Sequence, residues 1–310
     1  MIPFVALGAF MSRLAPGGAM RPGQYLSGIV TYAFIAAVLI CLGIGSIQAK
    51  RWAHALTLVT SWYALIMGAL ITILMTAMLP VMVRSVVAQA QKTTPTAATP
   101  LSTGAMAVVL TLVIVFAAFF LIIVPIAFVI FYGRRDVAET CRHRDPVERW
   151  TDRAPLPVLA ASIILFVGGL YLFLTGISTP MFPLLGRYVT GLPGAACFFA
   201  LGAIDIYLAF PIFRRQPFAW WIAILTLTLR SLSLAITYAR ADMMRAYAKV
   251  GFSDAQINML RANPMFRGHI IFWWSLLAVI LFYGYMLWLK RYFKAANDAP
   301  PLNAFPMQTD

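Results

Sequence analysis

The chain has 310 residues, of which 62% are hydrophobic and only 11% are charged, whereas an ordinary soluble domain has about 25% charged residues. Apolar runs longer than about 18 residues recur along it without polar alternation, so they predict membrane-spanning helices and exclude a membrane β-barrel. The formal net charge of +14 does not indicate nucleic-acid binding, because the Lys and Arg residues are spread over short connections, where membrane topology and anionic head groups favour them.

The apolar runs predict an all-α, polytopic membrane protein with seven transmembrane helices. We expect these spans at residues 27–47, 55–83, 105–132, 156–175, 194–213, 218–238 and 269–289. They divide the chain into an N-terminal tail, a first three-helix unit, a charged cytoplasmic loop, a fourth span with a Pro/Gly-rich loop, a second three-helix unit and a C-terminal tail. In the same order, these segments are 1–26, 27–132, 133–155, 156–193, 194–294 and 295–310.

Two short basic corners, QAKRWAHAL (48–56) and RRQPFAWW (214–221), connect neighbouring spans. Short loops with Lys and Arg but no acids are typical of the cytoplasmic side, and Trp or Phe after them is typical of the membrane interface. We therefore expect the corners, the 133–155 loop and the C-terminus in the cytoplasm, at the inner membrane of a bacterium. The basic residues expected at this interface with the lipid bilayer are Lys50, Arg51, Arg134, Arg135, Arg214 and Arg215.

The likeness of the corners has two interpretations. Similar cytoplasmic hairpins look alike because the same physics selects them. Alternatively, spans one to three and five to seven form a degenerate parallel repeat, as in some transporters. Aligning Trp52 with Phe218 then pairs the corners, and a Phe-Tyr-Gly occurs in both third helices, at 131–133 and 282–284. The two Phe-Tyr-Gly motifs lie at different depths in their spans, which argues against the repeat.

Spans two and three contain prolines, and span two also has a polar stripe. Pro80 and Pro125 each remove a backbone hydrogen bond and are expected to kink their helices. The stripe lies on one helix face and consists of small and hydroxyl residues, for which close helix packing is the expected role. Its residues are Thr57, Ser61, Gly68, Thr72 and Thr76.

The 133–155 loop interleaves six arginines with five acids. Its sequence DPVE predicts a helix start, with Asp145 as N-cap, Pro146 as first helical residue and Glu148 as capping-box partner. Acids and bases in helical register, such as Asp145 and Arg149, indicate a solvated, self-paired surface. A second interpretation is a docking site for a cytoplasmic or membrane-protein partner.

The two remaining long connections differ in composition. Prolines and glycines in 176–193 exclude a regular helix and predict a surface loop or a partly re-entrant segment. In 239–267, we expect span six to continue to Lys249 with Gly251 as its stop. A short second helix is expected to begin within Ser253–Gln256.

Asp205 in span five and Arg230 in span six are the ionisable residues expected inside the membrane. The tight corner makes these spans antiparallel neighbours, and the depths of the two residues, about 12 and 18 Å, allow an ion pair. Arg230 belongs to a polar stripe on one helix face with Thr226, Ser233 and Thr237. The stripe either fixes helix packing or lines a path for a solute or protons.

No set of residues predicts catalysis. The three histidines and three cysteines form no metal-binding or haem-binding pattern, and no nucleophile or phosphate-loop motif is present. We therefore expect no cofactor and no metal. The leading interpretation is a non-enzymatic structural or interaction component of the cell membrane. The alternative is a small-solute or proton transporter that uses Arg230 and Asp205, and a lipid-modifying membrane enzyme is a weaker third.

Overall fold

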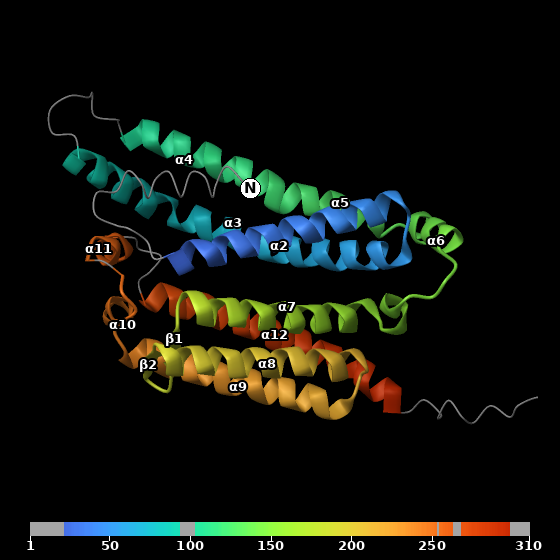
Figure 1. Cartoon of the computed structure of the whole chain (residues 1–310). Helices are drawn as coiled ribbons and strands as arrows, with labels where there is room; N and C mark the ends of the chain where they lie inside the picture. The colour runs from blue at the N-terminus through green and yellow to red at the C-terminus, as the bar shows by residue number, and fades with distance from the viewer. Residues whose placement is uncertain (1–21, 94–102, 253, 263–267, 298–310) are drawn as a thin grey trace, which may run out of the picture. The chain divides into compact units, whose positions relative to one another are not determined.

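The computed structural model is almost entirely helical, and it describes residues 22–93, 103–252, 254–262 and 268–297 (Figure 1). Seven helices in this part of the chain are long and apolar enough to cross a membrane, at boundaries close to the expected ones. They are Gly28–Ile47, Arg51–Ala77, Ala107–Tyr132, Leu156–Ser178, Leu192–Phe213, Pro217–Arg240 and Ser275–Phe293. The predicted all-α, polytopic membrane fold is confirmed. Most of the N-terminal tail, the whole 94–102 stretch and most of the C-terminal tail lie outside the described residues.

The chain forms two compact units. The first comprises residues 1–153 and 244–271, with helices α2 (Pro22–Ile47), α3 (Arg51–Thr93), α4 (Thr103–Ala118), α5 (Val124–Tyr132), α6 (Arg135–Arg144) and α11 (Asp254–Ala262). The second comprises residues 154–243 and 272–310, with α7 (Leu156–Ser178), strands β1 (Met181–Leu184) and β2 (Arg187–Thr190), α8 (Leu192–Phe213), α9 (Pro217–Arg240) and most of α12 (Gly268–Asn297).

Proline shapes the third span, as expected. A π-helical turn, η1 (Phe119–Ile123), separates α4 from α5, and the buried Pro125 is the second residue of α5. In a regular helix, the N–H of residue 125 would bond to the Leu121 carbonyl, and proline has no N–H. This carbonyl lies against Gly68 of α3, where an added Cβ would be only 2.1 Å from its oxygen. The close packing predicted for the polar stripe of span two is therefore confirmed at Gly68, whereas the Thr72 and Thr76 hydroxyls donate to carbonyls of their own helix. By contrast, α3 continues as a helix through Pro80.

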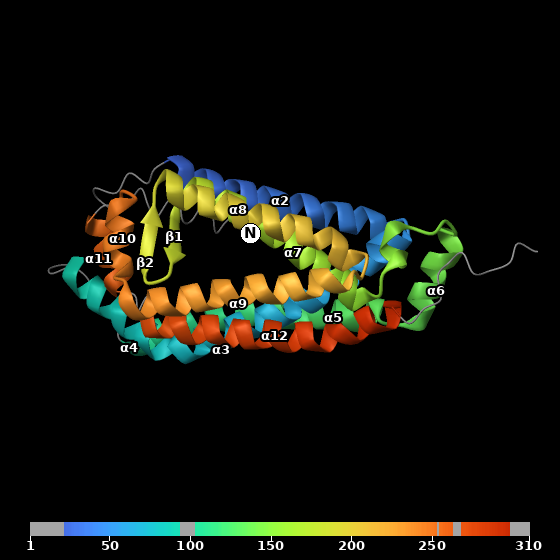
Figure 2. The same ribbon diagram turned by 90° about the horizontal axis from the view of Figure 1, so that it is seen from below.

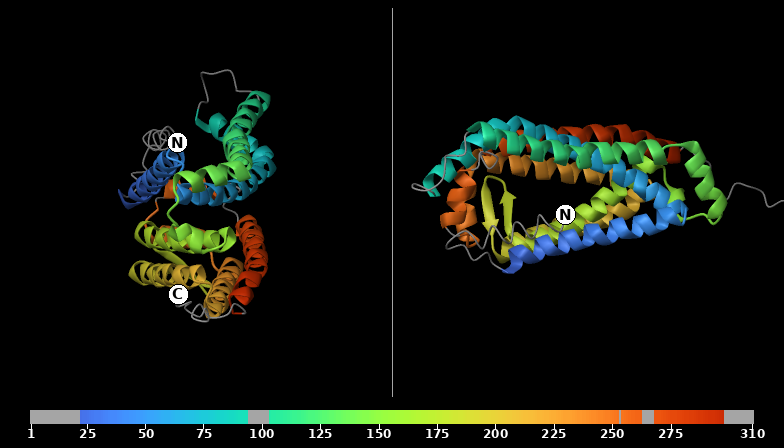
Figure 3. Two further views of the ribbon diagram at one scale, coloured as in Figure 1. Left: turned by 90° about the vertical axis from the view of Figure 1, so that its right-hand side faces the viewer. Right: turned by 90° about the horizontal axis from the view of Figure 1, so that it is seen from above.

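The prediction of a helix start at Asp145 is wrong. The α-helix in the charged loop is α6, and Asp145 is its C-cap with φ −127° and ψ 79°. A 3-10 turn, η2 (Trp150–Arg153), follows later in the loop. The Asp145 N–H donates to the Cys141 carbonyl at 3.0 Å. This N–H group is therefore not available to the Glu148 side chain, as a capping box would require. Pro146 also disfavours helical geometry in the residue before it. Figure 3 shows α6 beside the corner that joins α2 and α3.

The second unit is built on a close crossing of α7 and α8. A Cβ on Gly169 would be 2.7 Å from the Gly202 carbonyl oxygen, and a Cβ on Gly202 would be 2.8 Å from that of Gly169. Small residues at such crossings let two membrane helices approach at backbone distance. The apolar core of this unit lies toward the start of α7 and the end of α8, where α9 and α12 also contribute, and it includes Leu208, Ile212, Met286 and Leu289.

The 176–193 connection is not a regular helix beyond Ser178, as predicted, but an antiparallel hairpin. Strand β1 pairs with β2 in the register Phe182 to Val189 and Leu184 to Arg187. The two turn residues, Leu185 and Gly186, have φ of 44° and 97°, the signs of a type I′ turn. The hairpin lies at the end where α8 begins and α9 ends (Figure 2).

The extension of span six to Lys249 is interrupted. Helix α9 ends at Arg240, because Ala241 is extended with φ −104° and ψ 138°, and a separate helix, α10 (Met243–Lys249), follows. Gly251 stops α10 with φ 87°, which confirms its predicted role. The short helix expected next is α11; Ser253, within the predicted start, lies outside the described residues.

The two basic corners share their backbone geometry. Ala49 and Arg215, which the Trp52–Phe218 alignment pairs, both have positive φ, 50° and 57°. In each corner, the next N–H donates to a carbonyl five residues earlier, at 2.9 Å. Many helices end in this way, so the duplication stays a prediction. Gly133 is the C-cap of α5 and Gly284 lies inside α12, so the two Phe-Tyr-Gly motifs differ in depth as expected.

Candidate functional site

Asp205 of α8 and Arg230 of α9 form the ion pair that their spacing predicts. The Arg230 Nη1 donates to the Asp205 Oδ2 at 3.0 Å. The carboxylate side chain is only 6% exposed, whereas the arginine side chain is 35% exposed. The more deeply enclosed partner is therefore the acid, which depends on this arginine for a counter-charge.

The rest of the polar stripe on α9 has a role that the sequence did not indicate. Ser233 accepts a hydrogen bond from the Leu185 N–H at 3.0 Å and donates one to the Pro183 carbonyl at 2.9 Å. Thr237 accepts one from the Gly186 N–H at 3.1 Å and donates to the Ser233 carbonyl at 2.7 Å. The two hydroxyls thus hold the hairpin turn, which lies beside the end of α9 in Figure 2.

Thr226 differs from the other members of the stripe. Its hydroxyl is within 3.0 Å of the Ile222 and Ala223 carbonyls of its own helix. A bond of this kind satisfies the hydroxyl without joining two elements. The predicted stripe therefore comprises three local arrangements: an ion pair to α8, a clamp on the hairpin and an internal bond of α9.

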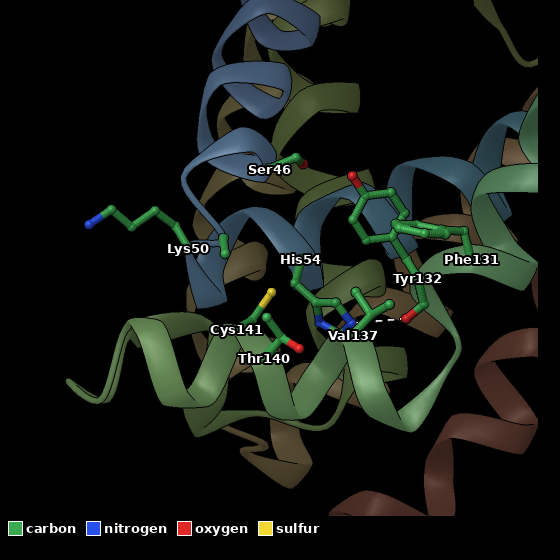
Figure 4. A pocket seen from close by; sticks show the side chains of 9 residues that line it. Ser46, Lys50, His54, Phe131, Tyr132, Val137, Thr140 and Cys141 are labelled. Atoms are coloured by element: carbon green, nitrogen blue, oxygen red, sulfur yellow. Dashed lines mark hydrogen bonds between the residues drawn. The ribbon is translucent and has the colours of Figure 1, made fainter.

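A cavity of about 270 Å³ lies in the first unit, between the α2–α3 corner, the end of α5 and α6 (Figure 4). Its volume is just below the roughly 300–1,000 Å³ typical of small-molecule pockets. His54, Tyr132 and Cys141 contribute to its wall with several small and apolar residues. The Lys50 side chain extends away from His54 (Figure 4), so its ammonium group is not directed into the cavity.

Two groups in the cavity wall have defined protonation. The ring Nε2 of His54 is 2.9 Å from the Tyr132 carbonyl oxygen, and because a carbonyl only accepts, Nε2 carries the proton. Burial, with a smaller effect of the Asp145 charge, raises the pKa of the Cys141 thiol. The thiol is therefore held in its neutral, weakly nucleophilic form. The cavity wall is largely apolar, and its Cys141 thiol is not an activated nucleophile.

The structure places the predicted interface residues at the two basic corners and at the start of α6. At the first corner, Arg51 Nε lies 3.2 Å from the Asp152 carboxylate. Asp145 forms the expected ion pair with Arg149, and the hydrogen bond from Arg149 lowers the pKa of Asp145. At the second corner, Arg214 is exposed and Arg215 is half-buried. Arg134 and Arg135 are exposed at the start of α6.

Among the polar links between helices of the second unit that sequence reasoning missed, two join an aromatic side chain to a backbone carbonyl. The Trp220 indole N–H donates to the Met286 carbonyl at 2.7 Å, and the Tyr285 hydroxyl donates to the Pro157 carbonyl. A buried Trp or Tyr in a membrane helix needs a partner for its polar atom, which is the signal that was available. The identity of the partner is not encoded locally, since 66 and 128 residues separate the two ends.

Within the described ranges, no group of three His, Cys, Asp or Glu side chains could hold a metal ion. No protein-family model, no curated protein and no solved structure matches the chain. The seven apolar helices make it a multi-pass integral membrane protein, and its function is argued from the geometry above.

Proposed function

We propose that the protein is a non-enzymatic component of the cell membrane, with a structural or interaction role. The observation that supports this proposal is the direct Asp205–Arg230 ion pair. Its neighbours Ser233 and Thr237 bind the hairpin, so these three polar residues of α9 connect elements of the same unit. Polar contacts between membrane helices specify packing more than they stabilise it, at about 0.6 kcal/mol on average.

A proton or solute path needs groups that can exchange partners. Asp205 is the one acid in the seven spans of the sequence, and it is already paired at 3.0 Å. A relay through the membrane usually employs several ionisable groups in series. A role in fixing how α8 packs on α9 requires only the Asp205–Arg230 ion pair and no further ionisable side chains.

The segment from α6 to Arg153 is the proposed interaction surface. Val137 and Cys141 face inward on α6, whereas the charged side chains of this helix are exposed. Asp136 in the first turn and Arg142, His143 and Arg144 in the last turn match the helix dipole. A firmly held helix with charges of both signs on its outer face is suited to a cytoplasmic or membrane-protein partner of complementary charge.

A small-solute or proton transporter is the second candidate function, and one observation favours it. The Arg230 side chain is 35% exposed, so part of this side chain is not covered by the protein. An accessible arginine at this depth could contact an anionic solute as well as Asp205.

A double-mutant cycle combined with a flux assay separates these functions. We expect Arg230→Gln to lower the free energy of unfolding by about 1–3 kcal/mol, because it leaves the enclosed Asp205 carboxylate without its partner. Asp205→Asn should cost less, since Arg230 is more exposed. The double variant should lose less than the sum of the two, by about 1 kcal/mol. Unfolding is followed in detergent micelles, and proton and solute flux in vesicles containing the purified protein.

Thr226→Val is the matched control, because Thr226 lies on the same face of α9 but bonds within its own helix. It should change stability by less than about 0.5 kcal/mol. Wild-type vesicles should show no more flux than empty ones. If wild-type protein conducts and Arg230→Gln abolishes conduction at unchanged stability, the transporter is right and the structural role is wrong.

A further inference from the structure

One end of the second unit gathers cations on aromatic rings. At this end, α9 begins at Pro217, two residues after Arg215. The last turns of α12 contain Lys290 and Arg291. The Trp220 indole N–H donates to the Met286 carbonyl at 2.7 Å, which fastens the first turn of α9 to α12. As a result, the Lys290 Nζ lies 4.9 Å from the centre of the Trp220 ring and 5.1 Å from that of Trp221.

The next cation on α12 is held in the same way. The Arg291 guanidinium carbon is 4.2 Å from the Trp288 ring centre and 4.9 Å from that of Tyr292, whose hydroxyl accepts a hydrogen bond from Arg291 at 3.0 Å. Trp221 and Trp288 are 60% and 44% exposed. Exposed tryptophans at the ends of spans are typical of the head-group level of a bilayer, so this level is where the two cations are positioned.

Among the described residues of the second unit, no carboxylate lies near these charges. In the described part of the second unit the acids are Asp205 and Asp242. Asp205 is paired with Arg230 and lies eight residues before the end of α8, about 12 Å along the helix axis. Asp242 follows the opposite end of α9, about 36 Å away along the helix. The first corner differs, because its Arg51 is paired with Asp152.

We propose that this end of the second unit, formed by Arg214, Arg215, Lys290 and Arg291, binds the phosphate of an anionic phospholipid. Cation–π contacts orient the Lys290 and Arg291 side chains and leave both positively charged. The N–H groups of these side chains can donate hydrogen bonds to the oxygens of a phosphodiester. The exposed faces of Trp221 and Trp288 provide an apolar surface for the lipid's glycerol and first acyl carbons. A lipid fits better than a soluble phosphate, because the cations lie at the ends of membrane spans.

Lipid retention measured by native mass spectrometry tests this site. Purified protein in detergent micelles is titrated with phosphatidylglycerol or with phosphatidylcholine of the same acyl chains. We expect tighter binding of phosphatidylglycerol. Lys290→Gln should weaken it roughly fivefold, the effect of removing one cation near an anionic lipid, while Lys290→Arg should retain it. Binding of phosphatidylcholine should be the same in all variants.

Arg142→Gln is the control, since Arg142 is an exposed cation in the mixed-charge helix α6; it should leave phosphatidylglycerol binding unchanged. Equal binding of the two lipids, or an equal loss with Lys290→Gln and Arg142→Gln, overturns the site. A thermal stabilisation by millimolar inorganic phosphate that matches that by phosphatidylglycerol would also overturn the assignment to lipid. Far-ultraviolet circular dichroism verifies that each variant is folded.

Discussion

The charged residues inside the membrane spans give the most information in the sequence about contacts between helices. A charge in an apolar span is costly enough that a partner must exist, and the tight corner between spans five and six restricted where that partner could lie. The Asp205–Arg230 pair could therefore be predicted with its geometry. Ser233 and Thr237 could not be placed, because a hydroxyl can also be satisfied by a carbonyl of its own helix, as in Thr226.

The Cys141 thiol gives a residue-scale prediction on pH. Because burial raises its pKa, the folded protein retains the thiol proton at pH values where an exposed cysteine has lost it. The neutral Cys141 thiol therefore makes its full contribution to the free energy of unfolding below the pKa of the thiol in the unfolded chain. This contribution is lost as the pH rises through the pKa of the thiol in the folded protein. In a Cys41→Ala/Cys197→Ala background, we expect Cys141 to react with a maleimide several-fold more slowly than an exposed cysteine, with a rate that increases at higher pH.

The reference for this rate is Arg142→Cys in a chain that lacks the native cysteines, since residue 142 is the exposed neighbour on α6. Rates are compared between about pH 7 and about pH 9.5, the range in which ordinary thiols titrate. Equal rates for both positions throughout this range would show that Cys141 is neither buried nor shifted in pKa.

Among the elements, spans were predictable and the segments between them were not. A run of apolar residues specifies a membrane helix without knowledge of its neighbours. The hairpin depends on its neighbours, because leucine is disfavoured at the positive-φ position of Leu185. Its turn N–H groups are held by Ser233 and Thr237 from α9, about 50 residues later. For α6, the sequence carries a signal in the acid of its first turn and the bases of its last, but DPVE matches a helix start more closely.

The packing of α3 against the third span gives an element-scale prediction. Gly68→Ala should lower the free energy of unfolding by about 1–3 kcal/mol or more, because its Cβ would meet the Leu121 carbonyl oxygen at 2.1 Å. Thermal unfolding in detergent micelles measures the effect. Gly43→Ala in α2 is the control, since nothing lies within 4 Å of a Cβ added there. If both variants unfold at the same temperature, this contact does not hold the two helices together.

At the scale of the whole molecule, hydropathy determines the number of crossings and basic residues determine their direction. Seven crossings follow from the sequence because each span is specified locally. The division into two compact units does not, since it depends on contacts such as Gly169 with Gly202 and Trp220 with Met286. These contacts join helices through single small or aromatic residues whose partners are remote in sequence.

The sidedness of two connections that flank α7 tests the polytopic fold most directly. Glu148→Cys and Arg187→Cys, both at exposed positions, are placed singly in a chain without native cysteines and treated with a membrane-impermeant maleimide. One crossing separates these positions, so we expect them to be labelled from opposite faces. Residue 187 should react in intact cells and residue 148 only after permeabilisation. Labelling of both positions from the same face would contradict the membrane fold on which the ion pair, the lipid site and the interaction surface all depend.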